Sequence, residues 1–246
     1  MQSNLTIDIG NTSLKAAVFK GDTLVETCRD GEEALGKLIA RHRPQHCAIS
    51  NVGEEPAALQ SLLAHIPGKV LRVSGATPSP LRNAYAQPET LGADRWAAAT
   101  GAWTLFGGRP LLIVDAGTCI TYDFVSGDGT FCGGTIAPGI RMRLEAMHAM
   151  THRLPAVTPT EGKTPERLYQ QDTAHAMEAG ARLGARMELE GYARHYAAAH
   201  PGLLVCLTGG DTISLEASEA WETRRVPDLV HTGLNALLRH ATDART

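Results

Sequence analysis

Two short segments of this 246-residue chain share one pattern. Residues 7–12 read Ile-Asp-Ile-Gly-Asn-Thr, and residues 114–119 read Val-Asp-Ala-Gly-Thr-Cys. In each, an apolar stretch typical of a strand ends in Asp-x-Gly and a polar residue, and a second alternating stretch follows. Coincidence between such short segments is one explanation. Because strands and then helices follow both copies, we interpret the chain as two related α/β lobes, at 1–109 and 110–246, with a cleft between them.

Periodicity and breaker residues predict the elements of each lobe. Strands are expected over 4–9, 14–18, 23–28, 47–52, 69–73, 111–115, 119–125 and 203–208. Helices are expected over 32–42, 57–65, 93–106, from about 140, over 173–200 and over 232–240. We interpret 77–88 as a Pro-rich linker, 127–129 as a turn and the pair Gly133-Gly134 as a loop.

Composition limits the class of protein. Apolar residues make up 43% of the chain and charged residues 20%, which excludes a disordered or collagen-like chain. No stretch approaches the ~20 apolar residues of a membrane helix, and the start has no signal-peptide pattern. With a net charge of −3, nucleic acid would need a local basic patch, and residues 41–43 indicate only a solvated helix end. Five scattered cysteines without a CxxC pair favour a reducing compartment, so we expect a soluble, cytoplasmic protein.

The first Asp-x-Gly turn, residues 8–13, offers backbone N–H groups and hydroxyls above a carboxylate. Such a nest suits phosphate oxygens, and Asp8 can hold a hydrated cation against them. Lys15 adds positive charge if it points into the cleft. The alternative is an ordinary tight hairpin with a satisfied Asp.

Two further glycine turns support the phosphate interpretation. Asp115 ends a strand whose apolar run implies burial, and a buried carboxylate needs a cation or donors. Residues 208–211, Thr-Gly-Gly-Asp, close another apolar strand. Three such turns suit a nucleotide between two lobes, with phosphates on the first two and the nucleoside near the third.

Asp94 and Arg95 open an Ala-rich helix after Gly92. Asp94 stands where an N-cap or first-turn acid would, and that capping role is the simpler explanation. A capping Asp does not require Arg95 beside it, however. Together the pair is suited to polarise an acceptor hydroxyl and to bind an anionic group of a substrate.

Two apparent motifs are set aside. Residues 31–38 imitate a P-loop, but Leu38 stands in place of the Mg-binding Ser or Thr. His148 and His152 are four residues apart without the Glu of a zinc hydrolase helix, so a surface pair is expected.

Together these segments resemble the type III pantothenate kinases, members of the superfamily of acetate and sugar kinases, Hsp70 and actin. The resemblance covers essentially the whole chain and rests on DIGNTSLK (8–15), YAQPETLGADR (85–95), DAGTCITYD (115–123), GGTIAPGI (133–140) and TGGD (208–211). It implies an α/β fold of duplicated ribonuclease H-like lobes, as in actin-like ATPases, each a mixed sheet flanked by helices.

The resemblance also implies the activity, which is ATP-dependent phosphorylation of pantothenate to 4'-phosphopantothenate, the first step of coenzyme A biosynthesis. By position, Asp94 is the general base. The implied ATP-binding residues are Asp8, Ile9, Gly10, Asn11, Thr12, Ser13, Leu14, Lys15 and Thr118. The implied pantothenate-binding residues are Tyr85, Gly92, Ala93, Asp94, Arg95 and Thr173.

The implied cofactors are ATP, Mg²⁺ near Asp8, and a monovalent cation, K⁺ or NH₄⁺, at Asp115. The implied assembly is a homodimer with the substrate pocket near the subunit contact, and no nucleic acid or membrane partner is expected. Cys119 stands where the family more often has Ala, which we expect to be tolerated. Two alternatives remain: a kinase of the same superfamily acting on another small hydroxyl substrate, and a non-catalytic accessory factor for transcriptional regulation.

Overall fold

A computed structural model describes residues 3–11, 13–29, 31–160, 167–211, 213–216 and 218–243. The chain divides into two compact units. The first comprises Met1–Gly108, Val125–Gly133 and Asp228–Thr246, and the second comprises Arg109–Phe124 and Gly134–Pro227. The C-terminal helix therefore packs within the first unit.

The first unit is built on a five-stranded sheet with the order β3-β2-β1-β4-β5. Its strands are β1 (Ser3–Ile9), β2 (Leu14–Lys20), β3 (Thr23–Arg29), β4 (His46–Asn51) and β5 (Val70–Arg72). β1, β2 and β3 pair antiparallel, whereas β4 pairs parallel to both β1 and β5, so the sheet is mixed. The predicted hairpin at the start of the chain is confirmed.

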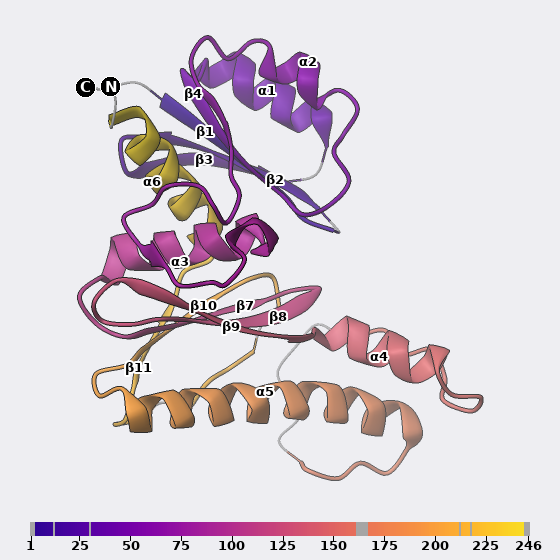
Figure 1. The fold of residues 1–246 in the computed structure, drawn as a ribbon. Coiled ribbons are helices and arrows are strands. Elements are labelled where there is room, and N and C mark those ends of the chain that lie inside the picture. Colours follow the sequence, from indigo (N-terminus) through magenta and orange to yellow (C-terminus); the bar gives the residue numbers. More distant parts are fainter. Residues whose placement is uncertain are drawn as a thin grey trace. The chain divides into compact units, whose positions relative to one another are not determined.

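Helices cover both faces of this sheet (Figure 1). α1 (Glu32–His42) and α2 (Leu59–Leu63) lie on one face, and α3 (Ala93–Phe106) and α6 (Leu229–Asp243) lie on the other. The alternation of β1 sets which side chains meet which helices. Leu5, Ile7 and Ile9 share a buried core with α1 and α2, while Thr6 contacts His231 of α6 at 2.9 Å. Asp8 is two residues after Thr6, so its side chain leaves the same face of β1 as Thr6, the face that α3 and α6 cover.

The second unit contains the central strands of a six-stranded sheet with the order β11-β10-β7-β8-β9-β6. The strands are β6 (Arg82–Asn83), β7 (Leu111–Ala116), β8 (Cys119–Val125), β9 (Thr130–Pro138), β10 (Leu204–Thr208) and β11 (Glu222–Arg225). β10 is parallel to both β7 and β11.

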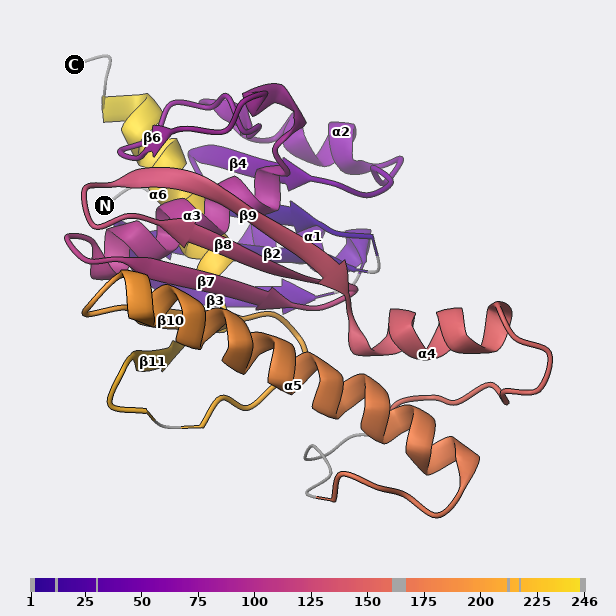
Figure 2. The same cartoon turned by 60° about the horizontal axis from the view of Figure 1, so that its bottom comes forward.

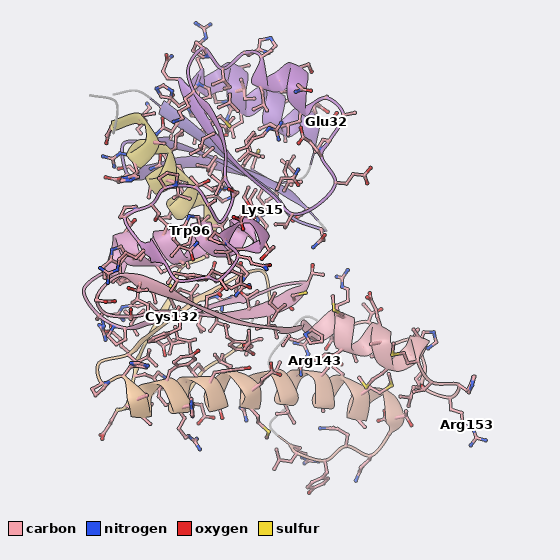
Figure 3. The ribbon with its side chains drawn as sticks, in the orientation of Figure 1. Lys15, Glu32, Trp96, Cys132, Arg143 and Arg153 are labelled. Carbon is pink, nitrogen blue, oxygen red and sulfur yellow. The ribbon has the colours of Figure 1, made fainter. Side chains whose placement is uncertain are left out.

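The helices of the second unit are α4 (Ile140–Ala149) and α5 (Thr173–Ala199). α5 runs along the strands of its unit (Figure 2) and packs on β8 through stacked rings, with Tyr192 on Tyr122 at 4.3 Å and Tyr196 on Phe124 at 4.7 Å. Arg143 of α4 reaches Glu188 of α5 at 2.6 Å and so joins the two helices (Figure 3).

The loop predicted at Gly133-Gly134 is wrong, because both residues lie inside β9. A Cβ atom at position 134 would lie only 2.1 Å from the Tyr122 carbonyl oxygen. Gly134 therefore permits a close approach of two backbones and does not mark a chain reversal. The predicted linker at 77–88 also contains β6 and leads into a 3-10 turn, η1 (Pro88–Thr90).

Candidate active site

Asp8 lies near the end of β1, in a row that crosses three strands. Lys15 on β2 is its register partner on one side, and Ser50 on β4 is its register partner on the other. Residues in register on neighbouring strands present their side chains on the same face of the sheet. The β1–β2 hairpin and the parallel pairing of β1 with β4 thus bring a carboxylate, an ammonium group and a hydroxyl together.

The charge of Asp8 is not fully compensated. Its pKa is raised to about 6, first by burial and then by the nearby charge of Asp94, while Lys15 and Ser50 act in the opposite direction. One carboxylate oxygen, Oδ1, is buried and has no hydrogen-bond partner within the described residues. A site with these properties has capacity for a cation or for donors from a ligand.

The turn after Asp8 is held by backbone contacts. Gly10 N–H donates to the Ser13 carbonyl oxygen at 3.0 Å, and Val52 N–H donates to that of Ile9 at 3.0 Å. Asn11 is exposed and Ser13 is half-buried. The side chains of Ile9 and Leu14 are buried in the core with α1 and α2. Of these two predicted ATP-binding residues, only the backbone groups therefore remain to contact a ligand. Thr12 lies outside the described residues.

Asp94 is a first-turn acid of α3 and not its N-cap. The N-cap is Gly92, which makes no side-chain capping bond, and Asp94 Oδ1 accepts the N–H of Arg95 at 2.8 Å. A Cβ atom at position 92 would lie 2.6 Å from Asp94 Oδ1. Glycine at 92 therefore leaves the room in which the Asp94 carboxylate sits, at the positive end of the helix.

Arg95 and Tyr85, two predicted substrate-binding residues, are in contact. The guanidinium carbon lies 5.8 Å from the centre of the Tyr85 ring, a cation–π geometry, and Arg95 is only 7% exposed. Tyr85 rests in turn against Phe131, with ring centres 6.2 Å apart. Ala93 is buried, so its side chain packs in the unit.

Trp96 fixes the start of α3. Its indole N–H donates to the Thr77 carbonyl oxygen at 2.9 Å, and its ring meets the edge of Phe131 with centres 5.6 Å apart. Figure 3 labels Trp96 on α3 and Lys15 on β2 within the same unit. Asp8, Lys15, Tyr85, Asp94 and Arg95 thus all belong to the first unit.

The second unit gathers the other glycine turns. Asp115, at the end of β7, is in register with Thr208 at the end of β10. Asp211 N–H donates to the Ala116 carbonyl oxygen at 2.9 Å, which joins the Thr-Gly-Gly-Asp segment to the Asp115 turn. Gly139 N–H donates to the Thr118 carbonyl oxygen at 3.0 Å, so the end of β9 meets the same turn. Burial raises the pKa of Asp211, and Arg182 and Arg141 lower it.

Thr173, the remaining predicted residue, begins α5 and is exposed. Its neighbour Asp172 caps the helix by accepting His175 N–H at 3.0 Å.

In the part of the chain that the structure describes, no group of three or more His, Cys, Asp or Glu side chains is arranged to bind a metal ion. No helix in that part is long and apolar enough to cross a membrane.

Two contributors to the site were missed by sequence reasoning. Ser50 lies in an apolar stretch, and its place beside Asp8 follows only from the parallel pairing of β1 with β4. Phe131 supports both Tyr85 and Trp96, and no local signal distinguishes it from another core aromatic.

Solved structures with the same fold define the class of the protein. The chain is similar to a Campylobacter jejuni protein described as a Baf family transcriptional activator, with a TM-score of 0.60, 21% identity, and coverage of 97% of this chain and 99% of that one. It is also similar to the activator of 2-hydroxyisocaproyl-CoA dehydratase from Clostridium difficile with bound ADPNP (TM-score 0.55, 12% identity, coverage 99% and 97%). MreB 5 of Spiroplasma citri bound to AMPPNP matches with a TM-score of 0.50, 10% identity, and coverage of 100% and 98%. The protein therefore has the α/β fold of actin-like ATPases.

The sequence comparisons narrow this class to one family. The profile of the type III pantothenate kinases matches residues 4–195. Type III pantothenate kinases from Phocaeicola vulgatus and Bacteroides fragilis are 38% and 39% identical over 240 residues, and each alignment covers 96% of this chain and 98% of the relative. The chain belongs to the type III pantothenate kinase family.

Proposed function

We propose that the cluster around Asp8 and Asp94 is the phosphoryl-transfer half of a pantothenate kinase site, with Asp94 as general base. By family the chain is a pantothenate kinase, which phosphorylates pantothenate in coenzyme A biosynthesis. The observation that carries the residue assignment is the electrostatic contact between two motifs distant in sequence: the charge of Asp94 raises the pKa of Asp8. Acceptor and nucleotide groups must meet in this way for transfer.

Phosphoryl transfer requires positioning and charge neutralisation more than covalent chemistry from the protein. The turn of residues 8–15 binds the ATP phosphates through backbone N–H groups and Lys15. The primary hydroxyl of pantothenate lies against Asp94, whose Oδ2 accepts the proton, since Oδ1 already accepts Arg95 N–H. Arg95, braced by the Tyr85 ring, binds the carboxylate of pantothenate.

The carboxylate of Asp8, which is buried and incompletely hydrogen-bonded, fits a hydrated Mg²⁺ that arrives with ATP, because Mg²⁺ typically uses one or two carboxylates and the phosphate oxygens of its substrate. When bound, Mg²⁺ neutralises charge on the β- and γ-phosphates. Thr118 is assigned to ATP and Thr173 to pantothenate by family position. We further propose a homodimer located in the cytoplasm.

A coupled assay of ADP release with pantothenate and ATP tests this function directly. We expect turnover with pantothenate and little with other small hydroxyl compounds, such as sugars or acetate. Preference for one of those compounds would identify another kinase of the superfamily. Absence of ADP release with every acceptor would favour a non-catalytic accessory factor and contradict the proposal.

The cation role of Asp115 yields a separate prediction. Asp115 lies near the end of β7, and a carboxylate together with the backbone carbonyl groups of the following turn would supply the oxygen ligands that K⁺ prefers. Replacing these ions by Na⁺ is expected to lower the rate by at least about tenfold, equivalent to ~1.4 kcal/mol of transition-state stabilisation. Steady-state rates at constant ionic strength give the measurement, with Asp115→Asn as an ion-insensitive comparison. Equal rates in Na⁺ and K⁺ would remove the cation role.

A further inference from the structure

Two buried oxygen atoms of the first unit lack hydrogen-bond partners, and they belong to neighbouring positions. They are Asp8 Oδ1 and Ser50 Oγ. Within the described residues, the other buried side-chain atoms without a hydrogen-bond partner are on Tyr122, Arg186, Glu190 and Trp221, all in the second unit, and those of Arg186 and Glu190 form an ion pair at 3.5 Å. Because both atoms without a hydrogen-bond partner in this unit lie at paired positions, we explain their missing hydrogen bonds together.

The strand pairing places the two groups side by side. Asp8 and Ser50 are in register in the parallel pair of β1 and β4, so both side chains leave the same face of the sheet. Ser50 is fully buried. Lys15 on β2 is in register with Asp8 on the opposite side from Ser50. The hydroxyl of Ser50 can donate, and the carboxylate oxygen of Asp8 can accept.

A buried hydroxyl without a partner costs folding free energy, on the order of 1–3 kcal/mol. Ser3, on β1 of the same sheet, shows the ordinary case: it is also buried, and its hydroxyl donates to the His42 carbonyl oxygen at 3.1 Å. Ser50 therefore does not behave as a residue whose hydroxyl stabilises the resting fold. Buried polar groups of this kind are typical of functional sites.

We propose that Ser50 is a positioning residue for Asp8: its hydroxyl donates to Asp8 Oδ1 when a magnesium nucleotide occupies the turn, and holds the carboxylate toward the cation. The inference rests on the proposed function of this turn. Before loading, Ser50 lies close enough to Asp8 to lower the pKa of its carboxyl group, but neither Asp8 Oδ1 nor Ser50 Oγ completes a hydrogen bond. The nearby charge of Asp94 makes the charged form of Asp8 less favourable in this state. Partners that orient a metal-binding carboxylate typically contribute about 10- to 100-fold to affinity or activity.

The test uses Ser50→Ala and Ser50→Cys, with Ser3→Ala as the matched control from the same sheet. For both Ser50 variants we expect kcat/KM for MgATP to fall about 10- to 100-fold, with an unchanged KM for pantothenate. We also expect Ser50→Ala to unfold at the same temperature as the unmodified protein or higher, because it removes an unsatisfied hydroxyl. Ser3→Ala should show the reverse: lower stability by about 1 kcal/mol and unchanged kinetics.

Calorimetric binding of MgADP, which needs no turnover, separates this inference from the proposed function. A loss of MgADP affinity in the Ser50 variants supports the positioning role even if pantothenate is not the acceptor. Unaltered MgADP affinity and kinetics in Ser50→Ala would overturn it. Failure of Ser50→Ala to fold, or a loss of stability with unchanged MgADP affinity in Ser50→Cys, would show a structural role and overturn it equally.

Discussion

Replacing Asp94 with Asn is expected to lower kcat about 10²- to 10⁴-fold, the range typical for removal of a general base. The substitution preserves size and the acceptor oxygen that receives Arg95 N–H at 2.8 Å. It also keeps the clearance that Gly92 provides. What it removes is the basicity needed to take the hydroxyl proton of the acceptor.

Stability measurements distinguish this loss from unfolding. Because Asp94 raises the pKa of Asp8 through repulsion of like charges, Asp94→Asn relieves that repulsion. The variant should therefore unfold at the same temperature or higher. Asp22→Asn, at an exposed Asp paired with Arg239, serves as the control and should retain its rate. Near-normal turnover in Asp94→Asn would exclude Asp94 as the base, and the first-turn helix role would then suffice.

Elements with strong local signals were predicted to within a residue or so. α3 occupies 93–106 as expected, since an Ala-rich run ends there at a Gly-Gly breaker. β8 also has its predicted bounds, 119–125. α6 is longer than the predicted 232–240, because its first residues, including Leu229, are apolar and packed but precede the clear helical period.

Elements defined by distant partners were harder to find. β6 is two residues long and exists because Arg82 and Asn83 pair with β9. β11 reads Glu-Thr-Arg-Arg, which has no apolar alternation, and its pairing with β10 gives it strand geometry. Gly133 and Gly134 carry a loop signal that the pairing of β9 overrides.

The sequence named Asp8, Lys15, Asp94 and Arg95 as candidate residues, and all four lie in the first unit, while their roles stay predictions. The pattern of β1 sends Asp8 to the face opposite Ile7 and Ile9, where α3 and α6 pack. The role of Ser50 was not predictable in this way, because it depends on which strand pairs with β1 and in what register. The meeting of Asp8 and Asp115 across one crevice stays a prediction.

Gly209 is expected to tolerate no side chain, because two separate constraints act on it. Its φ is +94°, where a residue other than glycine costs roughly 1–2 kcal/mol. A Cβ atom there would also lie 2.2 Å from the Ala116 carbonyl oxygen, directly after Asp115. A backbone shift that removed this clash would move the Thr-Gly-Gly-Asp turn away from β7. It would also weaken the hydrogen bond from Asp211 N–H to the Ala116 carbonyl oxygen.

Gly209→Ala should therefore lose at least about 2 kcal/mol of stability, which for a chain of this size lowers Tm by at least about 4 °C. Gly210→Ala is the matched control, because no atom lies within 4 Å of its Cβ position. Gly210→Ala should change the free energy of unfolding by less than about 0.5 kcal/mol. Thermal and denaturant unfolding of the two variants provide the comparison. Equal stability would mean that the turn yields without strain and that the close packing of β7 against the third glycine turn does not fix the Asp115 site.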